Sequence, residues 1–121
     1  MQQESGKVNA LREAIVKIRF AGGGELECVL DTGFDGAVLL PVSAANTLGL
    51  PVVARLVFAL VGGARMSADV ALGEIHWLGE RRTVEVILNN DDDALVGTEL
   101  LDGTELIVDY VKSLVTITRH E

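Results

Sequence analysis

Three consecutive residues, Asp31, Thr32 and Gly33, are the strongest candidates in this chain for acid–base chemistry. They directly follow residues 25–30, in which polar and apolar side chains largely alternate as they do in a strand. Such an aspartate can supply a general acid or base, the threonine hydroxyl can hold the loop, and the glycine lets another backbone approach closely. An ordinary turn is the alternative, because all three residue types favour turns. The tripeptide occurs once in the 121 residues.

The elements that must position this tripeptide are predicted to be mostly short strands. The first, over residues 11–20, is rich in β-branched and aromatic side chains. Further strands are predicted over residues 25–30, 37–40, 56–61, 65–77, 82–88, 94–97, 105–110 and 114–118. Gly62 and Gly63 fall between two of these strands and favour a hairpin turn. The sequence alone does not distinguish an ordinary hairpin turn from a functional flap.

Two short helices complete the prediction. Residues 41–48 are predicted to be helical because Pro41 suits the first turn of a helix and Gly49 suits the position just past its end. A single helical turn is predicted over residues 98–101. Residues 1–10 are expected to be a flexible polar tail that precedes one domain over residues 11–121.

Composition narrows the class of protein. Hydrophobic residues make up 49% of the chain, which excludes a disordered protein. The formal net charge of −8 argues against binding to nucleic acid or to an anionic membrane surface. Cys28 is the only cysteine, so no internal disulfide can form, and we expect it to be a small core residue. The N-terminus is polar and lacks the apolar stretch of a secretion signal. The single cysteine and the polar N-terminus together predict a cytoplasmic protein.

Three segments in order along the chain carry a family resemblance: VLDTGFDG at residues 29–36, the Gly62-Gly63 hairpin, and LVGTELL at residues 95–101. Together they resemble the retroviral-type, or retropepsin-like, aspartic peptidases, including the small single-domain members found in bacteria. The resemblance spans residues 14–118. It implies an all-β, closed aspartic-peptidase barrel with one or two short helices, working as a homodimer on a peptide or protein substrate.

The same resemblance implies the roles of the site residues. Asp31 from each of two subunits would flank one water, and this dyad would hydrolyse a peptide bond without a metal or cofactor. Thr32 would hold the two loops together across the dimer axis, and the carbonyl of Gly33 would accept a hydrogen bond from the substrate. The chain termini commonly form the dimer interface in this family, which makes residues 114–118 the expected interface strand.

Further positions match the parts of the family that bind substrate and support the loop. Asp35 matches an acid that pairs with the main-chain amides of the substrate, although a purely structural role for Asp35 is equally open. The tip of the flap that closes over the cleft is matched by Val61, Gly62, Gly63 and Ala64. Support behind the catalytic loop is matched by Val96 and Gly97.

Two positions depart from the family pattern. Phe34 stands where a small residue usually follows the tripeptide, and Thr98 stands where an arginine usually pairs with the acid that corresponds to Asp35. Three hypotheses therefore remain open at the level of the sequence. The chain is an active homodimeric peptidase, or a peptide-binding or assembly module of the same fold with little or no turnover, or an unrelated small β-barrel that contains the tripeptide by chance.

Overall fold

The computed structural model describes residues 2–120, which form ten strands and two short helices. The strands are β1 (Gln2–Val8), β2 (Ala14–Phe20), β3 (Glu25–Leu30), β4 (Val38–Pro41), β5 (Val52–Ala59), β6 (Arg65–Trp77), β7 (Glu80–Asn89), β8 (Leu95–Val96), β9 (Thr104–Asp109) and β10 (Leu114–Arg119). The helices are α1 (Val42–Leu48) and α2 (Thr98–Leu101). The predicted fold class, all-β with two short helices, is confirmed.

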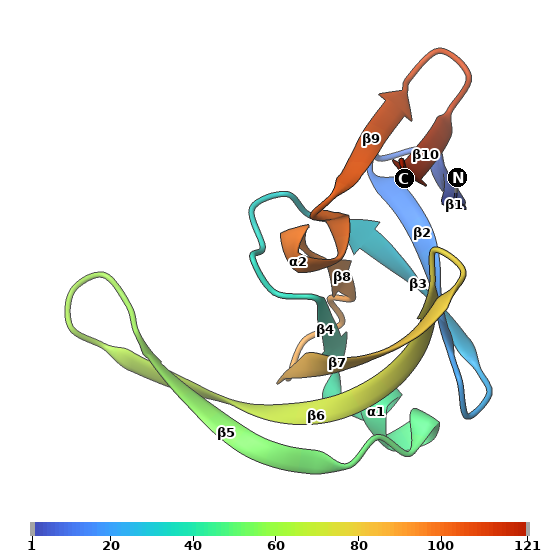
Figure 1. Cartoon of the computed structure of the whole chain (residues 1–121). Coiled ribbons are helices and arrows are strands. Elements are labelled where there is room, and N and C mark those ends of the chain that lie inside the picture. Colours follow the sequence, from blue (N-terminus) through green and yellow to red (C-terminus); the bar gives the residue numbers. More distant parts are fainter. Residues whose placement is uncertain (1, 121) are drawn as a thin grey trace.

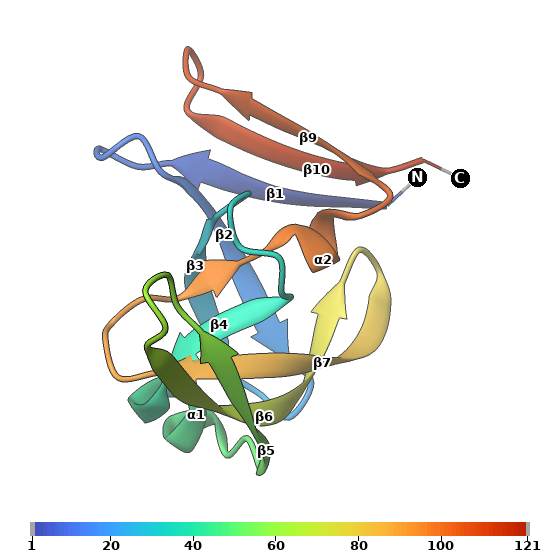
Figure 2. The same ribbon diagram turned by 90° about the vertical axis from the view of Figure 1, so that its left-hand side faces the viewer.

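The strands form a single sheet in the order β5-β6-β7-β4-β8-β3-β2-β1-β10-β9, and β2 also pairs with β6. Neighbouring strands are antiparallel except for β3 with β8 and β4 with β7, which are parallel. In Figure 1 the β5–β6 hairpin extends away from the other strands and curves toward the side of the molecule where the loop after β3 lies. Figure 2 shows β9, β10 and β1 as one layer, with both chain ends at the same end of it.

The core gathers alternate residues of these strands, and Trp77 is its largest fully buried side chain. The indole nitrogen of Trp77 donates a hydrogen bond of 3.0 Å to the carbonyl oxygen of Leu100, which joins the end of β6 to α2. Cys28 is also buried, as predicted, and desolvation raises the pKa of its thiol to about 12. The core therefore reaches from the long hairpin to the short helix that follows β8.

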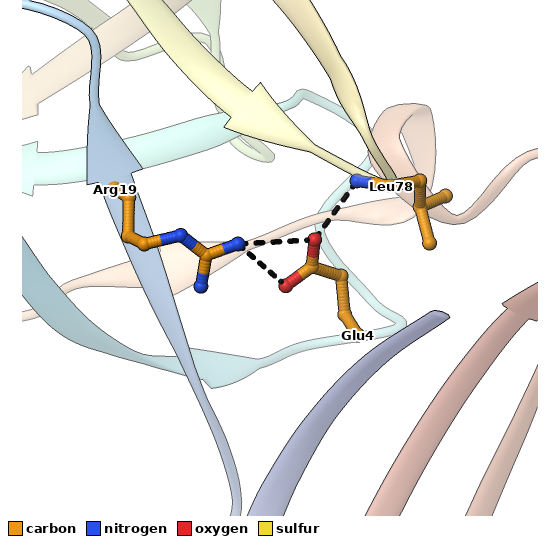
Figure 3. Close-up of polar contacts among 3 residues, drawn as sticks. All are labelled: Glu4, Arg19 and Leu78. Carbon is orange, nitrogen blue, oxygen red and sulfur yellow. Dashed lines mark hydrogen bonds and ion pairs between the residues drawn. The ribbon is translucent and has the colours of Figure 1, made fainter. Parts of the chain in front are cut away.

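The expectation of a flexible tail at the N-terminus is wrong for the described residues, because residues 2–8 form β1 between β10 and β2. Figure 3 shows one reason why this polar segment is held. Glu4 is only 7% exposed, and its carboxylate accepts a hydrogen bond of 2.8 Å from the backbone N–H of Leu78. The guanidinium of Arg19 on β2 lies 3.3 and 3.4 Å from the two oxygens of the same carboxylate. A buried charge with two partners thus ties β1 to the rest of the fold.

Several strands and helices begin at residues other than those predicted. The first predicted strand begins at Ala14 rather than at residue 11, because the side chain of Asn9 accepts hydrogen bonds from the backbone N–H groups of Leu11 and Glu13 and closes a turn. Strand β5 begins at Val52, four residues earlier than predicted, as its pairing with β6 extends through a β-bulge. Helix α1 begins one residue after Pro41. Gly49 follows its end as predicted, and it adopts the left-handed conformation.

Candidate active site

Asp31 directly follows β3, and the two-residue strand β8 fixes where that strand ends. β8 lies between β3 and β4, parallel to the first and antiparallel to the second. The backbone N–H of Asp31 donates to the carbonyl of Val96 at 2.9 Å, and the N–H of Gly97 donates to the carbonyl of Ala37 at 3.0 Å. Both ends of the loop that carries Asp31 are therefore attached to β8 and the residue after it.

Within the loop, the backbone orients the Asp31 carboxylate. Oδ1 of Asp31 accepts a hydrogen bond of 2.8 Å from the N–H of Gly33, and the Asp31 carbonyl accepts one of 3.1 Å from the N–H of Phe34. Asp31 is half-buried, whereas Thr32 and Gly33 are exposed. The carboxylate is thus held in one orientation at the surface of the single chain, where a second group can reach it.

Gly97 supports this loop from behind by close backbone approach. A Cβ atom at Gly97 would lie 2.2 Å from the carbonyl oxygen of Gly36 and 2.5 Å from that of Phe34, so only glycine fits. The N–H of Thr98 donates to the Phe34 oxygen at 2.8 Å. Val96, immediately before Gly97, is fully buried. The structure therefore places Val96 and Gly97 against the loop that carries Asp31.

The loop opens onto two cavities beside α2 and β9. One, of about 600 Å³, is lined by Thr32, Asp35, Thr98, Glu99, Leu101, Asp102, Thr104 and Leu106. The other, of about 460 Å³, is lined by Arg12, Glu13, Ala14, Val29, Leu30, Asp31, Thr32, Leu95, Leu106, Val108 and Tyr110. The structure thus brings the predicted Asp31, Thr32 and Asp35 to adjoining cavities. It adds Leu106 and Val108, which the sequence prediction missed because their segment shows only the alternation of a strand.

Asp35 is exposed, and Thr98 does not pair with it. Both the backbone N–H and the hydroxyl of Thr98 donate to the carbonyl oxygen of Phe34, at 2.8 and 3.4 Å. Among residues 2–120 the Asp35 carboxylate forms no ion pair. Asp35 shares its cavity with two further acids, Glu99 and Asp102. This cavity therefore favours a ligand that donates hydrogen bonds or carries positive charge.

The four residues predicted to contact substrate from above, Val61, Gly62, Gly63 and Ala64, lie at the tip of the β5–β6 hairpin. The N–H of Leu60 donates to the carbonyl of Ala64 at 2.7 Å and closes the turn, in which both glycines have positive φ, 94° and 86°. The tip lines neither of the two cavities beside Asp31. The middle of the hairpin does approach the loop, because Leu56 and Gly36 line one small cavity of about 110 Å³.

Within residues 2–120, no group of three or more His, Cys, Asp or Glu side chains is placed to hold a metal ion. No helix in this part of the chain has the length and apolar character needed to cross a membrane.

Solved structures share this fold, although no protein-family model and no curated protein matches the chain. A retropepsin-like aspartic protease from Rickettsia conorii superimposes with a TM-score of 0.66 at 16% identity, over 97% of this chain and 90% of that one. The EIAV protease, solved with the inhibitor HBY-793, gives a TM-score of 0.58 at 18% identity, over 77% and 88% of the two chains. The protease of simian foamy virus (mac) gives 0.53 at 17% identity, over 72% and 90%. The chain therefore has a retropepsin-like fold, which excludes an unrelated barrel.

Proposed function

We propose that this chain is an aspartic endopeptidase that works as a homodimer, with Asp31 of each copy on either side of one water molecule. The observation that carries the proposal is the Asp31 carboxylate itself. The N–H of Gly33 orients it at 2.8 Å, on a loop anchored to β8 and open to a cavity, in a chain with a retropepsin-like fold. One chain supplies one such carboxylate, and a second copy is the simplest source of the other.

The proposed chemistry follows from placing two like carboxylates side by side. Both cannot ionise without a large electrostatic cost, so the pair shares one proton near its working pH. The ionised Asp31 takes a proton from the water as the water attacks the amide carbonyl, and the protonated Asp31 donates to the oxygen that gains negative charge. A proton then passes to the leaving nitrogen. Thr32, exposed beside Asp31, would hold the two loops together across the axis.

The substrate in this proposal is an extended peptide beneath the β5–β6 hairpin. Strand β5 is exposed along its whole length and carries apolar side chains, which suits apolar residues of a peptide. The tip, residues 61–64, would act as a flap that closes over the peptide and excludes water. Asp35 would accept hydrogen bonds from the peptide main chain, and the carbonyl of Gly33 would do so beside the cut bond. The buried, reduced Cys28 is compatible with a cytoplasmic enzyme.

One observation favours a second candidate, a peptide-binding or assembly module of the same fold without turnover. The N–H and hydroxyl groups of Thr98 both donate to the Phe34 carbonyl, and threonine carries no positive charge that could pair with Asp35. Among residues 2–120, Asp35 therefore has no cation beside it and stays free to pair with a ligand. A bound peptide could satisfy it without being cut.

Cleavage of a mixed peptide library between pH 3 and 8, a range that spans roughly the titration of carboxylates and histidine, separates the two candidates. We expect cleavage by the wild-type chain and a loss of at least about 100-fold in Asp31→Asn, which keeps the shape but removes the shared proton. Asp92→Asn, in the exposed loop after β7, is the matched control and should cleave normally. A folded wild-type dimer that binds peptides and cuts none across this range would refute the peptidase proposal and favour the module.

A further inference from the structure

The single sheet leaves two strands with one unpaired edge among residues 2–120, β5 at one end and β9 at the other. β10 pairs on one side with β1, from Gln2↔Arg119 to Lys7↔Leu114, and on the other with β9. β1 in turn pairs with β2. Residues 114–118, the interface strand expected from the sequence, therefore have neither edge free. A partner that adds strands to this sheet must do so at β5 or at β9.

Of the two edges, β9 is the one that lies at the catalytic loop. Leu106 and Val108 line the cavity that contains Asp31, and Leu106 also lines the neighbouring cavity with Thr32. The edge of β5 belongs to the exposed hairpin (Figure 1). A second Asp31 must come within a few ångströms of the first, so the copy that supplies it must sit close to this loop. Of the two free edges, only β9 has residues that line the cavity containing Asp31.

We propose that a second copy of the chain pairs antiparallel along the free edge of β9, around a twofold axis at Leu106. This inference rests on the proposed function, because the second copy supplies the second Asp31. In Figure 2 the layer of β1, β10 and β9 ends at β9, and the pairing would continue it as β1-β10-β9-β9-β10-β1 across the two copies. Each chain keeps its own termini paired, so the interface is formed between two already folded sheets.

Symmetry limits the registers that such a pairing can take. Two copies of one strand lie antiparallel and side by side when the twofold axis is perpendicular to the sheet. Directly opposite residues then share a face of the sheet, and side chains alternate between faces along each strand. The axis must therefore pass between the two copies of one residue, which lie directly opposite each other. Registers centred on Leu106 or Ile107 pair five residues of each β9, and centring on any other residue pairs fewer.

Charge separates these two registers. Centring on Ile107 places Glu105 of each copy opposite Asp109 of the other, and like charges directly opposite are destabilising. Centring on Leu106 places Leu106 opposite itself, Thr104 opposite Val108 and Glu105 opposite Ile107, with no like-charged pair. It also puts the axis at the β9 residue that lines both cavities beside the catalytic loop. The Leu106 register is therefore the one that we propose.

Two charge variants at one position test both the edge and the register. Ile107 is 51% exposed in the single chain, so its replacement leaves the core intact. In the proposed register, Ile107→Glu puts a carboxylate opposite Glu105 of the other copy, twice per dimer, whereas Ile107→Lys puts an ammonium there. We expect the dissociation constant of the dimer to be at least about tenfold higher for Ile107→Glu than for Ile107→Lys at low salt, and the difference to shrink at high salt.

The dissociation constants would be measured by sedimentation over a dilution series of the full chain, with Val57→Glu on the β5 edge as the matched control. Fluorescence of Trp77, the only tryptophan, checks that each variant is folded. If Ile107→Glu and Ile107→Lys weaken the dimer equally, the Leu106 register is wrong. If neither changes it, or only Val57→Glu does, the β9 edge is wrong, while a wild-type dimer that cuts peptides keeps the peptidase proposal. A β9 dimer that cuts nothing keeps this inference and overturns the peptidase, and a strict monomer overturns both.

Discussion

Replacing Gly97 with alanine tests directly whether the segment after β8 positions the loop that carries Asp31. The backbone at Gly97 has φ −105° and ψ −175°, a conformation open to any residue, so alanine adds no backbone strain there. What alanine adds is a methyl group 2.2 Å from the carbonyl oxygen of Gly36 and 2.5 Å from that of Phe34. Both obstacles are backbone atoms of the loop that carries Asp31, so the loop itself must move.

The size of the effect follows from these contacts. Inserting one methyl group into a well-packed site costs about 1–3 kcal/mol when side chains can adjust. Here the obstacles are two backbone carbonyls, and the Phe34 oxygen also accepts the N–H of Thr98 at 2.8 Å, a hydrogen bond that the movement would strain. We therefore expect a loss of about 3 kcal/mol in the free energy of unfolding, or roughly 10 °C in Tm for a domain of this size.

Urea unfolding followed by the fluorescence of Trp77 measures this loss. Gly22→Ala is the matched control, because a Cβ at Gly22 meets nothing within 4 Å and its φ is not positive. We expect Gly22→Ala to leave stability unchanged or to raise it by up to about 1 kcal/mol, since alanine restricts the unfolded chain. The displaced loop should also lower peptide cleavage by Gly97→Ala. If the two alanine variants unfold within about 0.5 kcal/mol of each other, the close approach has no energetic weight and the reasoning fails.

Three further predictions concern the N-terminal strand, the buried thiol and the hairpin tip. Glu4→Leu should lower the free energy of unfolding by about 2–3 kcal/mol in a urea titration, and Glu4→Gln by less, because only the glutamine keeps an acceptor for the N–H of Leu78. The pKa of Cys28 is about 12 in the folded state, above the ordinary 9.0, so its contribution to stability is intact below pH 9 and is lost as the pH rises toward 12. Between pH 8 and 10, the free energy of unfolding should therefore fall by about 1 kcal/mol less for Cys28→Ala than for the wild type. Gly63→Val forces a β-branched residue to a φ of 86° and should lower kcat/KM for a peptide about tenfold. An unchanged kcat/KM would contradict the flap assignment.

Local sequence patterns predicted many of the strands and helices because these patterns agree with the tertiary packing. β6 spans the predicted residues 65–77, since its alternation places Ile75 and Trp77 in the core while glycines mark both of its ends. Gly49 ends α1 because the left-handed conformation there costs glycine little. In these segments the residue types that favour the element also face the core, so local and tertiary effects agree.

The N-terminal strand could not be predicted in the same way. Its sequence, QQESGKV, shows no apolar alternation, and only Glu4 among its residues is buried. The partners that hold it are distant in the chain: the N–H of Leu78, 74 residues away, and β10 at the other terminus. A strand that is stabilised by a buried ion pair and by long-range pairing looks like a solvated tail when it is read locally.

The residues of the candidate site also differ in whether a local sequence signal indicates them. The sequence indicated Asp31 and Gly97 as candidates because a motif of three residues and a glycine after a short strand are local signals. The assignment of β9 to the site was not, because Leu106 and Val108 show only ordinary strand alternation, and their position beside Asp31 depends on α2 turning the chain back. The expectation that residues 114–118 form the interface did not include the pairing of β10 with β1, which depends on residues at the other end of the chain.

The pairing of both termini within one chain has a consequence for how the proposed dimer would dissociate. A subunit that exchanges terminal strands with its partner loses part of its sheet when the partner leaves. Here β1, β10 and β9 remain hydrogen-bonded to each other in the single chain, and Glu4 keeps β1 tied to β2 and to Leu78. Dilution below the dimer dissociation constant should therefore abolish peptide cleavage while the far-ultraviolet circular dichroism and the fluorescence of Trp77 stay unchanged. Loss of the folded signal in parallel with activity would show that the single chain depends on its partner to fold, contrary to the pairing described above.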